Sequence, residues 1–312
     1  MSATARPPDR PTAVLLGIDA GASHSTVIVG RPDLTVLARA EGPASAMKPG
    51  GAAGSAAAIA DTARRALVLA GLSLPADRAV VGAAGAGRAQ EQGELAAAVV
   101  DSGIASNVTV LPDGEVALTS VFDDKPGIIV NAGTGSIAFA RDPSGALHRC
   151  GGYGWQLGDE GGGYWLGRRA LDFVARAQDG RGEGSTLLAR LLSSLGLQRF
   201  DDLIRWTATA TPTQVAALAP HVLNAAREGE GVAQRAAVDA ANELVGLAIA
   251  LERHFPGATP INVGTAGGLL IPTSPVAVAF QAILATDMPR ARLVTTRVDP
   301  ALGALRLAAA LV

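Results

Sequence analysis

Short apolar runs separated by glycine-rich turns recur along the 312-residue chain. The run at residues 14–18 reads as a buried strand, and two more strands are expected at residues 26–29 and 34–40, joined by the turn Arg31-Pro32-Asp33. Residues 54–70 repeat apolar positions at helical spacing and predict a helix. The chain then predicts a strand at 79–83, a helix at 91–101 and a strand at 108–111, followed by a further helix.

The same order of elements begins again near residue 128. Strands are expected at 128–131, 136–141 and 146–149, and a long, mostly helical stretch follows at about 163–255, with an exposed loop at 180–185 and helices at 213–227 and 232–254. The order resumes with a strand at 260–263, a helix at 275–284, a strand at 292–295 and a helix at 299–311. The pattern predicts an α/β fold of two βββαβαβα units, the second with a helical insertion. Ligands usually bind in the cleft between two such units.

Composition narrows the classes of protein that the chain can represent. Hydrophobic residues make up 48% and charged residues 17%, which is typical of a globular chain of two domains at this length. The net charge of -2 argues against a nucleic-acid partner. The single cysteine, Cys150, excludes an internal disulfide and fits a reducing cytoplasm. The polar, proline-rich start predicts no signal peptide, and no apolar run is long enough to predict a membrane span.

Three glycine-rich turns follow three predicted strands, and each contains a hydroxyl side chain: Ser23, Thr134 and Thr265. Glycine leaves backbone N–H groups open to an anion, so such turns suit phosphate. One turn alone is weak evidence in a chain with 38 glycines. Two of them, however, fall at the same place in the repeated unit, which favours phosphate binding. Neither a P-loop nor a dinucleotide-binding glycine motif is present.

Carboxylates near these turns are candidates for ligand contacts. Asp159 and Glu160 lie in a glycine-rich loop, where carboxylates more often hold hydroxyls or a metal than serve packing, although Glu160 reads equally well as support for the loop. Asp19 ends a strand, where it could hold magnesium through water. Asp113 reads equally well as a helix N-cap. The four histidines show no metal-binding spacing.

These motifs together resemble a known superfamily, that of actin, Hsp70 chaperones and sugar kinases. Residues 17–23, 131–136 and 263–268 are similar to its first phosphate, second phosphate and adenosine motifs. The segment Gly152-Tyr153-Gly154-Trp155-Gln156-Leu157-Gly158-Asp159-Glu160-Gly161 resembles the sugar-binding signature of N-acetylglucosamine kinases in the BadF/BadG/BcrA/BcrD ATPase group. The resemblance implies two RNase H-like domains that close over sugar and ATP. Residues 1–118 with 299–312 would form the first domain and residues 119–298 the second.

The resemblance also implies a role for each matching residue. Asp113 would be the catalytic base, and Asp19 would lie near magnesium. ATP and its phosphates would be bound by Asp19, Gly21, Ser23, Gly133, Thr134, Gly135, Gly264, Thr265, Gly267 and Gly268. The sugar would be bound by Ser45, Ser136, Gly154, Trp155, Gln156, Asp159 and Glu160. The implied activity is phosphorylation of the 6-hydroxyl of N-acetylglucosamine with ATP and Mg²⁺, by a cytoplasmic homodimer.

Departures from the family pattern leave the identity of the sugar substrate undecided. The loop after the third strand usually supplies an asparagine to the sugar, but Ala46 stands in its place here, with Ser45 and Lys48 as possible substitutes. Glucosamine is therefore the closest rival substrate. An iron–sulfur activator ATPase of the same group is disfavoured by the single cysteine, and so is a zinc-bearing ROK sugar kinase. A sugar-sensing regulator usually has a DNA-binding segment ahead of the fold, and the segment before Val14 is too short for one.

Overall fold

The computed structural model describes residues 12–183 and 185–312. The polar start, for which no signal peptide is predicted, and Gly184 of the expected 180–185 loop lie outside these ranges. The described chain divides into two compact units, unit 1 up to Lys125 with Val298–Val312, and unit 2 over Pro126–Arg297. The domain limit expected after residue 118 falls within helix α3 (Asp113–Phe122).

Unit 1 is built on a five-stranded mixed sheet with strand order β3-β2-β1-β4-β5. Its elements are β1 (Leu15–Ala20), β2 (His24–Gly30), β3 (Val36–Pro43), α1 (Ala52–Leu69), β4 (Arg78–Ala83), α2 (Ala89–Asp101), β5 (Val108–Pro112), α3 and α11 (Pro300–Ala310). β1 pairs antiparallel with β2 and parallel with β4, and β4 pairs parallel with β5. The predicted order of elements is confirmed.

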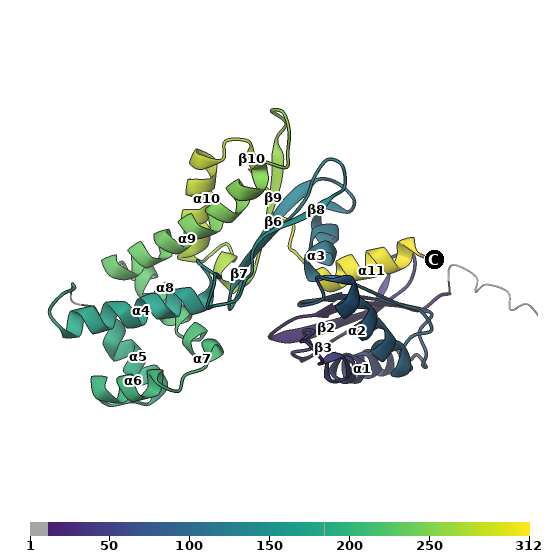
Figure 1. The fold of residues 1–312 in the computed structure, drawn as a ribbon, viewed down its shortest axis with the longest axis horizontal. Helices are drawn as coiled ribbons and strands as arrows, with labels where there is room; N and C mark the ends of the chain where they lie inside the picture. The colour runs from purple at the N-terminus through teal and green to yellow at the C-terminus, as the bar shows by residue number, and fades with distance from the viewer. Residues whose placement is uncertain (1–11, 184) are drawn as a thin grey trace, which may run out of the picture. The chain divides into compact units, whose positions relative to one another are not determined.

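Helices cover both faces of this sheet because side chains on its strands alternate between two cores. Leu16 and Ile18 pack into a core with residues of α1 and α2, whereas Leu15 packs with residues of α3 and α11. The last helix, α11, lies against the sheet and α3 (Figure 1). A Cβ at Gly17 would lie 2.2 Å from the carbonyl oxygen of Ala301, so glycine is required where α11 crosses β1.

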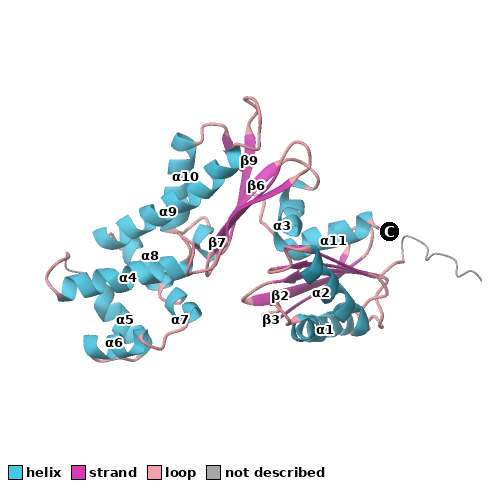
Figure 2. Cartoon of the chain, viewed as in Figure 1, coloured by secondary structure: helices cyan, strands magenta, loops and turns pink. Residues whose placement is uncertain are grey.

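Unit 2 repeats the sheet with the order β10-β9-β6-β7-β8. Its strands are β6 (Gly127–Ala132), β7 (Ser136–Arg141), β8 (Leu147–Gly151), β9 (Ile261–Ala266) and β10 (Ala291–Leu293). Its helices are α4 (Gly163–Gln178), α5 (Leu187–Leu195), α6 (Phe200–Thr207), α7 (Pro212–Ala216), α8 (Ala219–Arg227), α9 (Gly231–Glu252), the 3-10 turn η1 (Gly268–Leu270) and α10 (Pro275–Asp287). The described chain from the start of α4 to the end of α9 is mostly helical (Figure 2), as predicted for the insertion.

Two local predictions were wrong, and each has a stereochemical cause. The helix expected at 213–227 is divided, because Pro220 has no N–H and its ring would clash with the carbonyl of residue 216 in a continuous helix. The strand expected from residue 34 begins at Val36, since Leu34 has φ of 67° and donates its N–H to Arg31 in the turn. No helix of the described chain has the length and apolarity to cross a membrane.

Candidate active site

Two carboxylates lie at the same edge of the unit 1 sheet. Ala20, Ala83 and Pro112 are in register at the ends of β1, β4 and β5. Asp19 and Asp113 adjoin the ends of β1 and β5, and only β4 lies between these two strands. Burial, together with the nearby negative charge of Asp113, raises the pKa of Asp19 to about 6. Two carboxylates held this way favour a cation between or beside them.

Asp113 is the first residue of α3 and not its N-cap. Pro112 occupies the N-cap position and makes no side-chain capping bond. The carboxylate of Asp113 accepts the N–H of Gly114 at 2.9 Å. It therefore still interacts with the start of the helix, where the helix dipole favours a negative charge.

The loop from β3 to α1 is held against the first glycine turn. The carbonyl oxygen of Gly21 accepts the N–H groups of Ser45 and Ala46, each at 3.1 Å, and the N–H of Met47 donates to Ala84 at 2.8 Å. Ser45 is only 2% exposed, and its hydroxyl has no hydrogen-bond partner within the described residues. Ser23 in the neighbouring turn is exposed. Both residues thus lie at the sheet edge that carries Asp19.

In unit 2 the turn between β6 and β7 is fixed by backbone hydrogen bonds. The carbonyl of Gly133 accepts the N–H of Gly163, and that of Thr134 accepts the N–H of Tyr164, both at 2.8 Å. The turn is thereby tied to the first residues of α4. The Thr134 side chain is exposed, which leaves its hydroxyl accessible to a ligand.

The carboxylate of Asp159 lies directly on this turn. A Cβ at Gly135 would lie 2.2 Å from Asp159 Oδ2. Burial raises the pKa of Asp159, and hydrogen bonds from the backbone N–H groups of Gly154 and Ser136 oppose that rise. Asp159 has φ of 64°, a left-handed conformation that aspartate tolerates better than most residues. The buried Ser136 hydroxyl donates to the Glu160 carbonyl at 2.6 Å and so helps to hold the loop.

The rest of the loop before Asp159 presents exposed side chains. Trp155 is 45% exposed, and its ring centroid lies 5.2 Å from that of Tyr164. Gln156 and Glu160 are also exposed, and Gly154 has φ of 87°. An exposed indole near a half-buried carboxylate suits a sugar, which has apolar C–H faces and hydroxyl edges.

The third glycine turn adjoins the end of β6. Gly267 has φ of 87°, and a Cβ there would lie 2.2 Å from the carbonyl oxygen of Ala132, just before the Gly133 turn. Gly267 and Gly268 are exposed, whereas Gly264 is buried within β9 opposite Ile129. Thr265 is opposite Val130. Unit 2 therefore brings the second and third predicted motifs together, with Gly264 placed inside the sheet.

The model of the BadF/BadG/BcrA/BcrD ATPase family matches residues 16–308. The chain belongs to the BadF/BadG/BcrA/BcrD ATPase family. The fold and family predictions are thereby confirmed.

Proteins that are similar to this chain are named as amino-sugar kinases. The chain is 30% identical over 231 residues to the N-acetylmuramic acid/N-acetylglucosamine kinase of Clostridium acetobutylicum, covering 73% of this chain and 76% of that protein. It is 30% identical over 214 residues to the N-acetyl-D-glucosamine kinase of Dictyostelium discoideum, 65% of each. A crystal structure of a proposed N-acetylglucosamine kinase from Chromobacterium violaceum is 33% identical, with a TM-score of 0.79 and coverage of 95% and 98%.

The groups present in this member of the ATPase family fit a nucleotide and a magnesium ion. At Gly133 and Gly268 a Cβ would meet nothing within 4 Å, so an anion can approach the backbone N–H groups there closely. Within the described residues no cluster of three or more His, Cys, Asp or Glu could hold a metal. Asp19 alone still suits Mg²⁺, which usually keeps several waters and takes one or two carboxylates plus phosphate oxygens.

Two charged residues near Asp19 were not selected from the sequence. Arg39 Nη1 lies 2.6 Å from Asp299 Oδ2, and the charges of both residues act on the pKa of Asp19. Asp299 also caps α11 by accepting the N–H of Leu302. The Asp-Pro dipeptide predicts such a cap, and the family resemblance places residues 299–312 in the first domain, but no local pattern predicts the pairing of Asp299 with Arg39.

Asp19→Asn is expected to stabilise the ligand-free protein near neutral pH. Because the pKa of Asp19 is about 6 in the folded protein and its ordinary value is 3.8, the folded state holds this proton more tightly. The contribution of Asp19 to stability is therefore largest below about pH 4 and is lost as the pH rises through about 6. The asparagine variant should avoid this loss and gain about 1 to 3 kcal/mol at pH 7. Urea unfolding in EDTA across this range checks it, and parallel pH curves for the two proteins would contradict it.

Gly135→Ala is expected to displace the Asp159 carboxylate. The new methyl group would occupy the position of that carboxylate, and the hydrogen bonds from Gly154 and Ser136 would weaken. A loss of about 1 to 3 kcal/mol in the free energy of unfolding follows. Gly133→Ala is the matched control, since a Cβ there meets nothing within 4 Å. Equal unfolding free energies for the two variants would refute the contact.

Proposed function

We propose that the protein is an ATP-dependent kinase that transfers the γ-phosphoryl group of ATP to the 6-hydroxyl of N-acetylglucosamine. The observation that carries this proposal is the position of Asp159. Its carboxylate, a strong acceptor for sugar hydroxyls, lies against Gly135 in the glycine turn predicted to bind phosphate. A hydroxyl acceptor and a phosphate turn are thus adjacent within unit 2.

The similarity to named kinases supports the same activity. Two curated relatives at 30% identity and a solved structure at 33% identity are named as kinases of N-acetylglucosamine, one of them also of N-acetylmuramic acid. The glycine turns, the paired carboxylates and the Asp159 loop lie within the residues that the family model matches.

In this proposal unit 1 supplies the acid–base chemistry. Asp113 accepts the proton of the attacking 6-hydroxyl and directs its oxygen at the γ-phosphorus. A bond forms between that oxygen and phosphorus, the bond from phosphorus to the β,γ-bridging oxygen breaks, and ADP leaves. Asp19 would hold Mg²⁺, which would supply positive charge to neutralise the phosphates. The charge of Asp299 raises the pKa of Asp19, and that of Arg39 lowers it.

Unit 2 supplies binding groups for both substrates. The N–H groups and hydroxyl of the turn at Gly133, Thr134 and Gly135 bind phosphate, and Gly267 with Gly268 lines the adenosine. Asp159 accepts hydrogen bonds from sugar hydroxyls, with Trp155 and Gln156 beside the ring. Since Ser136 Oγ already donates to Glu160, its role in the proposal is to position the loop.

An assay of ADP release tests the proposal with Mg-ATP and a panel of sugars. The panel contains N-acetylglucosamine, glucosamine, N-acetylmannosamine, N-acetylmuramic acid and glucose. Saturable turnover with N-acetylglucosamine is expected. Turnover with glucosamine alone would move the proposal to that sugar, and no turnover with any sugar while ATP binds would remove the kinase assignment.

We further propose that the protein acts in the cytoplasm as a homodimer. The single cysteine fits a reducing compartment, and related kinases of this type are expected to pair. Light scattering coupled to size-exclusion chromatography should give twice the chain mass of 31.3 kDa. A mass of one chain at micromolar concentration would reject the dimer.

A further inference from the structure

A pocket of about 480 Å³ lies in the helical insertion of unit 2 and shares no residue with the glycine turns or the Asp159 loop. Its volume is within the range of small-molecule sites. Phe173 of α4 and the buried Val232 of α9 give it an apolar part. The pocket is therefore distinct from the candidate active site and large enough for a ligand of its own.

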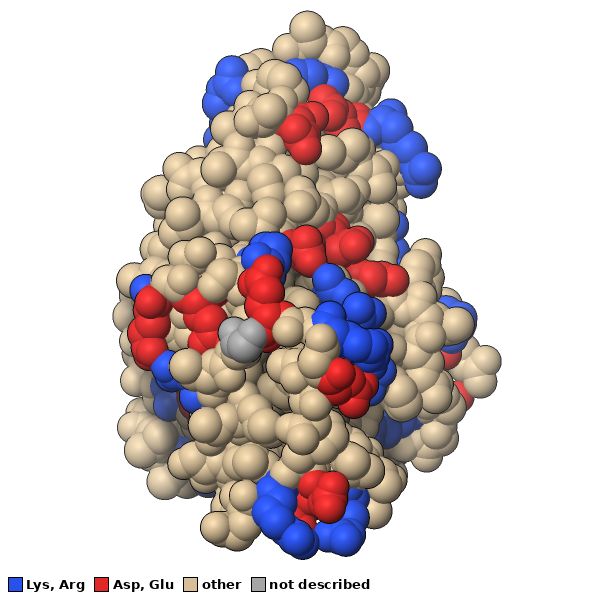
Figure 3. Space-filling view, turned by 90° about the vertical axis from the view of Figure 1, so that its left-hand side faces the viewer, with Lys and Arg blue, Asp and Glu red and all other residues tan. Residues whose placement is uncertain are grey.

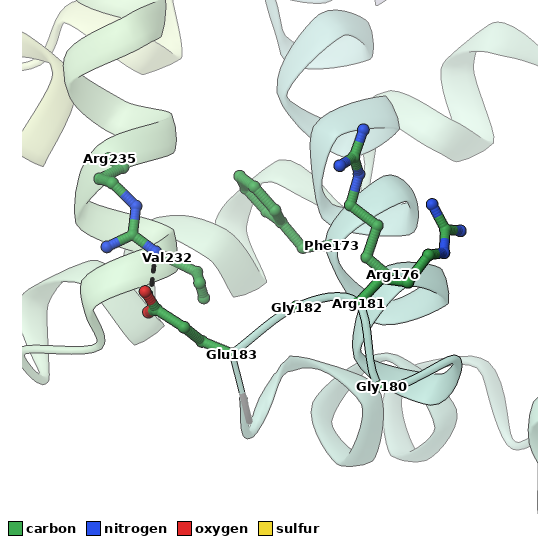
Figure 4. A pocket seen from close by; sticks show the side chains of 8 residues that line it. All are labelled: Phe173, Arg176, Gly180, Arg181, Gly182, Glu183, Val232 and Arg235. Carbon is green, nitrogen blue, oxygen red and sulfur yellow. Dashed lines mark hydrogen bonds and ion pairs between the residues drawn. The ribbon is translucent and has the colours of Figure 1, made fainter.

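Three arginines from three segments line this pocket: Arg176 of α4, Arg181 of the following loop and Arg235 of α9. In the view of Figure 4, Arg235 lies on one side of Phe173, with Arg176 and Arg181 on the other. Glu183 is the carboxylate that lines the pocket, and it lies 2.8 Å from Arg235. The side chains that line the pocket thus include three arginines and one carboxylate, and the Arg235 guanidinium is paired within the lining.

The partners of these arginines are exposed and easily displaced. Arg176 pairs with Asp172 at 3.1 Å and Arg181 with Asp179 at 2.6 Å. In these pairs and in the Arg235 pair, each side chain is 43% to 67% exposed. Exposed pairs contribute about 0 to 1 kcal/mol, so a ligand that makes bidentate contacts can replace them. Figure 3, a view from the side of α4 to α6, shows such mixed clusters of both signs.

Glu183 stands where an anionic ligand would bind. It follows Gly180, which has φ of 71°, and Gly182, where a Cβ would lie 3.2 Å from the Arg176 Cβ. Glycines bring this loop close to α4 and place the carboxylate of Glu183 at Arg235. The carboxylate of Glu183 therefore pairs with the guanidinium group that an anion would need.

We propose that this pocket binds a phosphorylated small molecule, whose phosphate takes the place of Glu183 at Arg235. Guanidinium groups match phosphate oxygens in bidentate geometry. Phe173 and Val232 contact the rest of the molecule, which extends toward Arg176 and Arg181. The pocket is separate from the proposed kinase site, so the inference does not depend on the kinase activity.

Equilibrium dialysis at constant ionic strength tests this site with three probes: inorganic phosphate, N-acetylglucosamine 6-phosphate and AMP. Arg235→Gln should weaken binding about 10-fold, as expected for loss of one charge-assisted hydrogen bond. Glu183→Gln should tighten binding about 3- to 10-fold, because it removes the competing carboxylate. A general effect of surface charge would have the same two signs, so the size of the Arg235→Gln effect is judged against the same change at an arginine outside the pocket.

Arg205→Gln is the matched control, since Arg205 of α6 forms a comparable ion pair with Asp202 at 3.0 Å outside the pocket. Binding of the probes to the glycine turns contributes equally in every variant. Equal changes for all probes assign the site to phosphate itself, and changes confined to AMP or to the sugar phosphate identify that ester as the ligand. Arg235→Gln isotherms that overlay those of Arg205→Gln would overturn the proposal, and so would weaker binding by Glu183→Gln.

Discussion

Asp113→Asn is expected to lower turnover by about 10²- to 10⁴-fold, the usual effect of removing a positioned general base. Asparagine has nearly the shape of aspartate, and its side-chain oxygen can still accept the N–H of Gly114. The start of α3 should therefore persist. Binding of sugar and of ATP should change little, because the proton transfer and not the binding contacts is removed. Steady-state kinetics with calorimetric binding of each substrate separates the two effects.

Measuring the stability of the Asp113→Asn variant shows whether a loss of turnover comes from lost catalysis or from misfolding. The charge of Asp113 raises the pKa of Asp19, so its removal should lower that pKa and leave the folded protein equally or more stable near pH 7. Asp101→Asn, the same change at an exposed carboxylate at the end of α2, should leave turnover unchanged. Normal turnover by the Asp113 variant would remove Asp113 from catalysis. Loss of turnover together with loss of stability would assign it a structural role.

The fold was largely predictable because both units follow simple periodic rules. Strand and helix order in each unit follows from alternating apolar runs and from helical spacing such as that of Ile59 and Ala63 in α1. The errors arose where one residue overrides a pattern, as Pro220 does between α7 and α8 and Leu34 does before β3. Helix and strand propensities averaged over a stretch of residues do not show the effect of one such residue on the backbone.

The candidate site was predictable in its motifs but not in its contacts. Glycine turns and nearby carboxylates are visible in the sequence, and the resemblance places residues 299–312 in the first domain, whereas the ion pair of Arg39 with Asp299 near Asp19 is not visible there. The hydrogen bond from the Ser136 hydroxyl to the Glu160 carbonyl likewise joins residues that are 24 positions apart in the sequence. Such long-range contacts depend on topology, which local patterns do not encode.

Asp159→Ala is expected to weaken sugar binding by about 10- to 150-fold, since a hydrogen bond to a charged group contributes about 1.5 to 3 kcal/mol. Alanine, however, is disfavoured at the left-handed backbone of residue 159, where φ is 64°. Asp159→Asn separates the effect of the lost charge from an effect on the backbone, because asparagine tolerates the left-handed conformation. It should keep the loop conformation and still lose most of the affinity. Titration calorimetry with N-acetylglucosamine, without nucleotide, measures both variants.

The neighbouring carboxylate provides the control for this prediction. Glu160 is exposed, and the contact that holds it to β7 uses its backbone carbonyl, so Glu160→Gln preserves the hydrogen bond from Ser136. If Glu160 only supports the loop, this variant should bind sugar normally while Asp159→Asn does not. If Glu160→Gln loses as much affinity as Asp159→Asn, both carboxylates contact the sugar. Unchanged affinity in both Asp159 variants would mean that the sugar binds elsewhere, and the contact of Asp159 with Gly135 would then serve only to fold the loop.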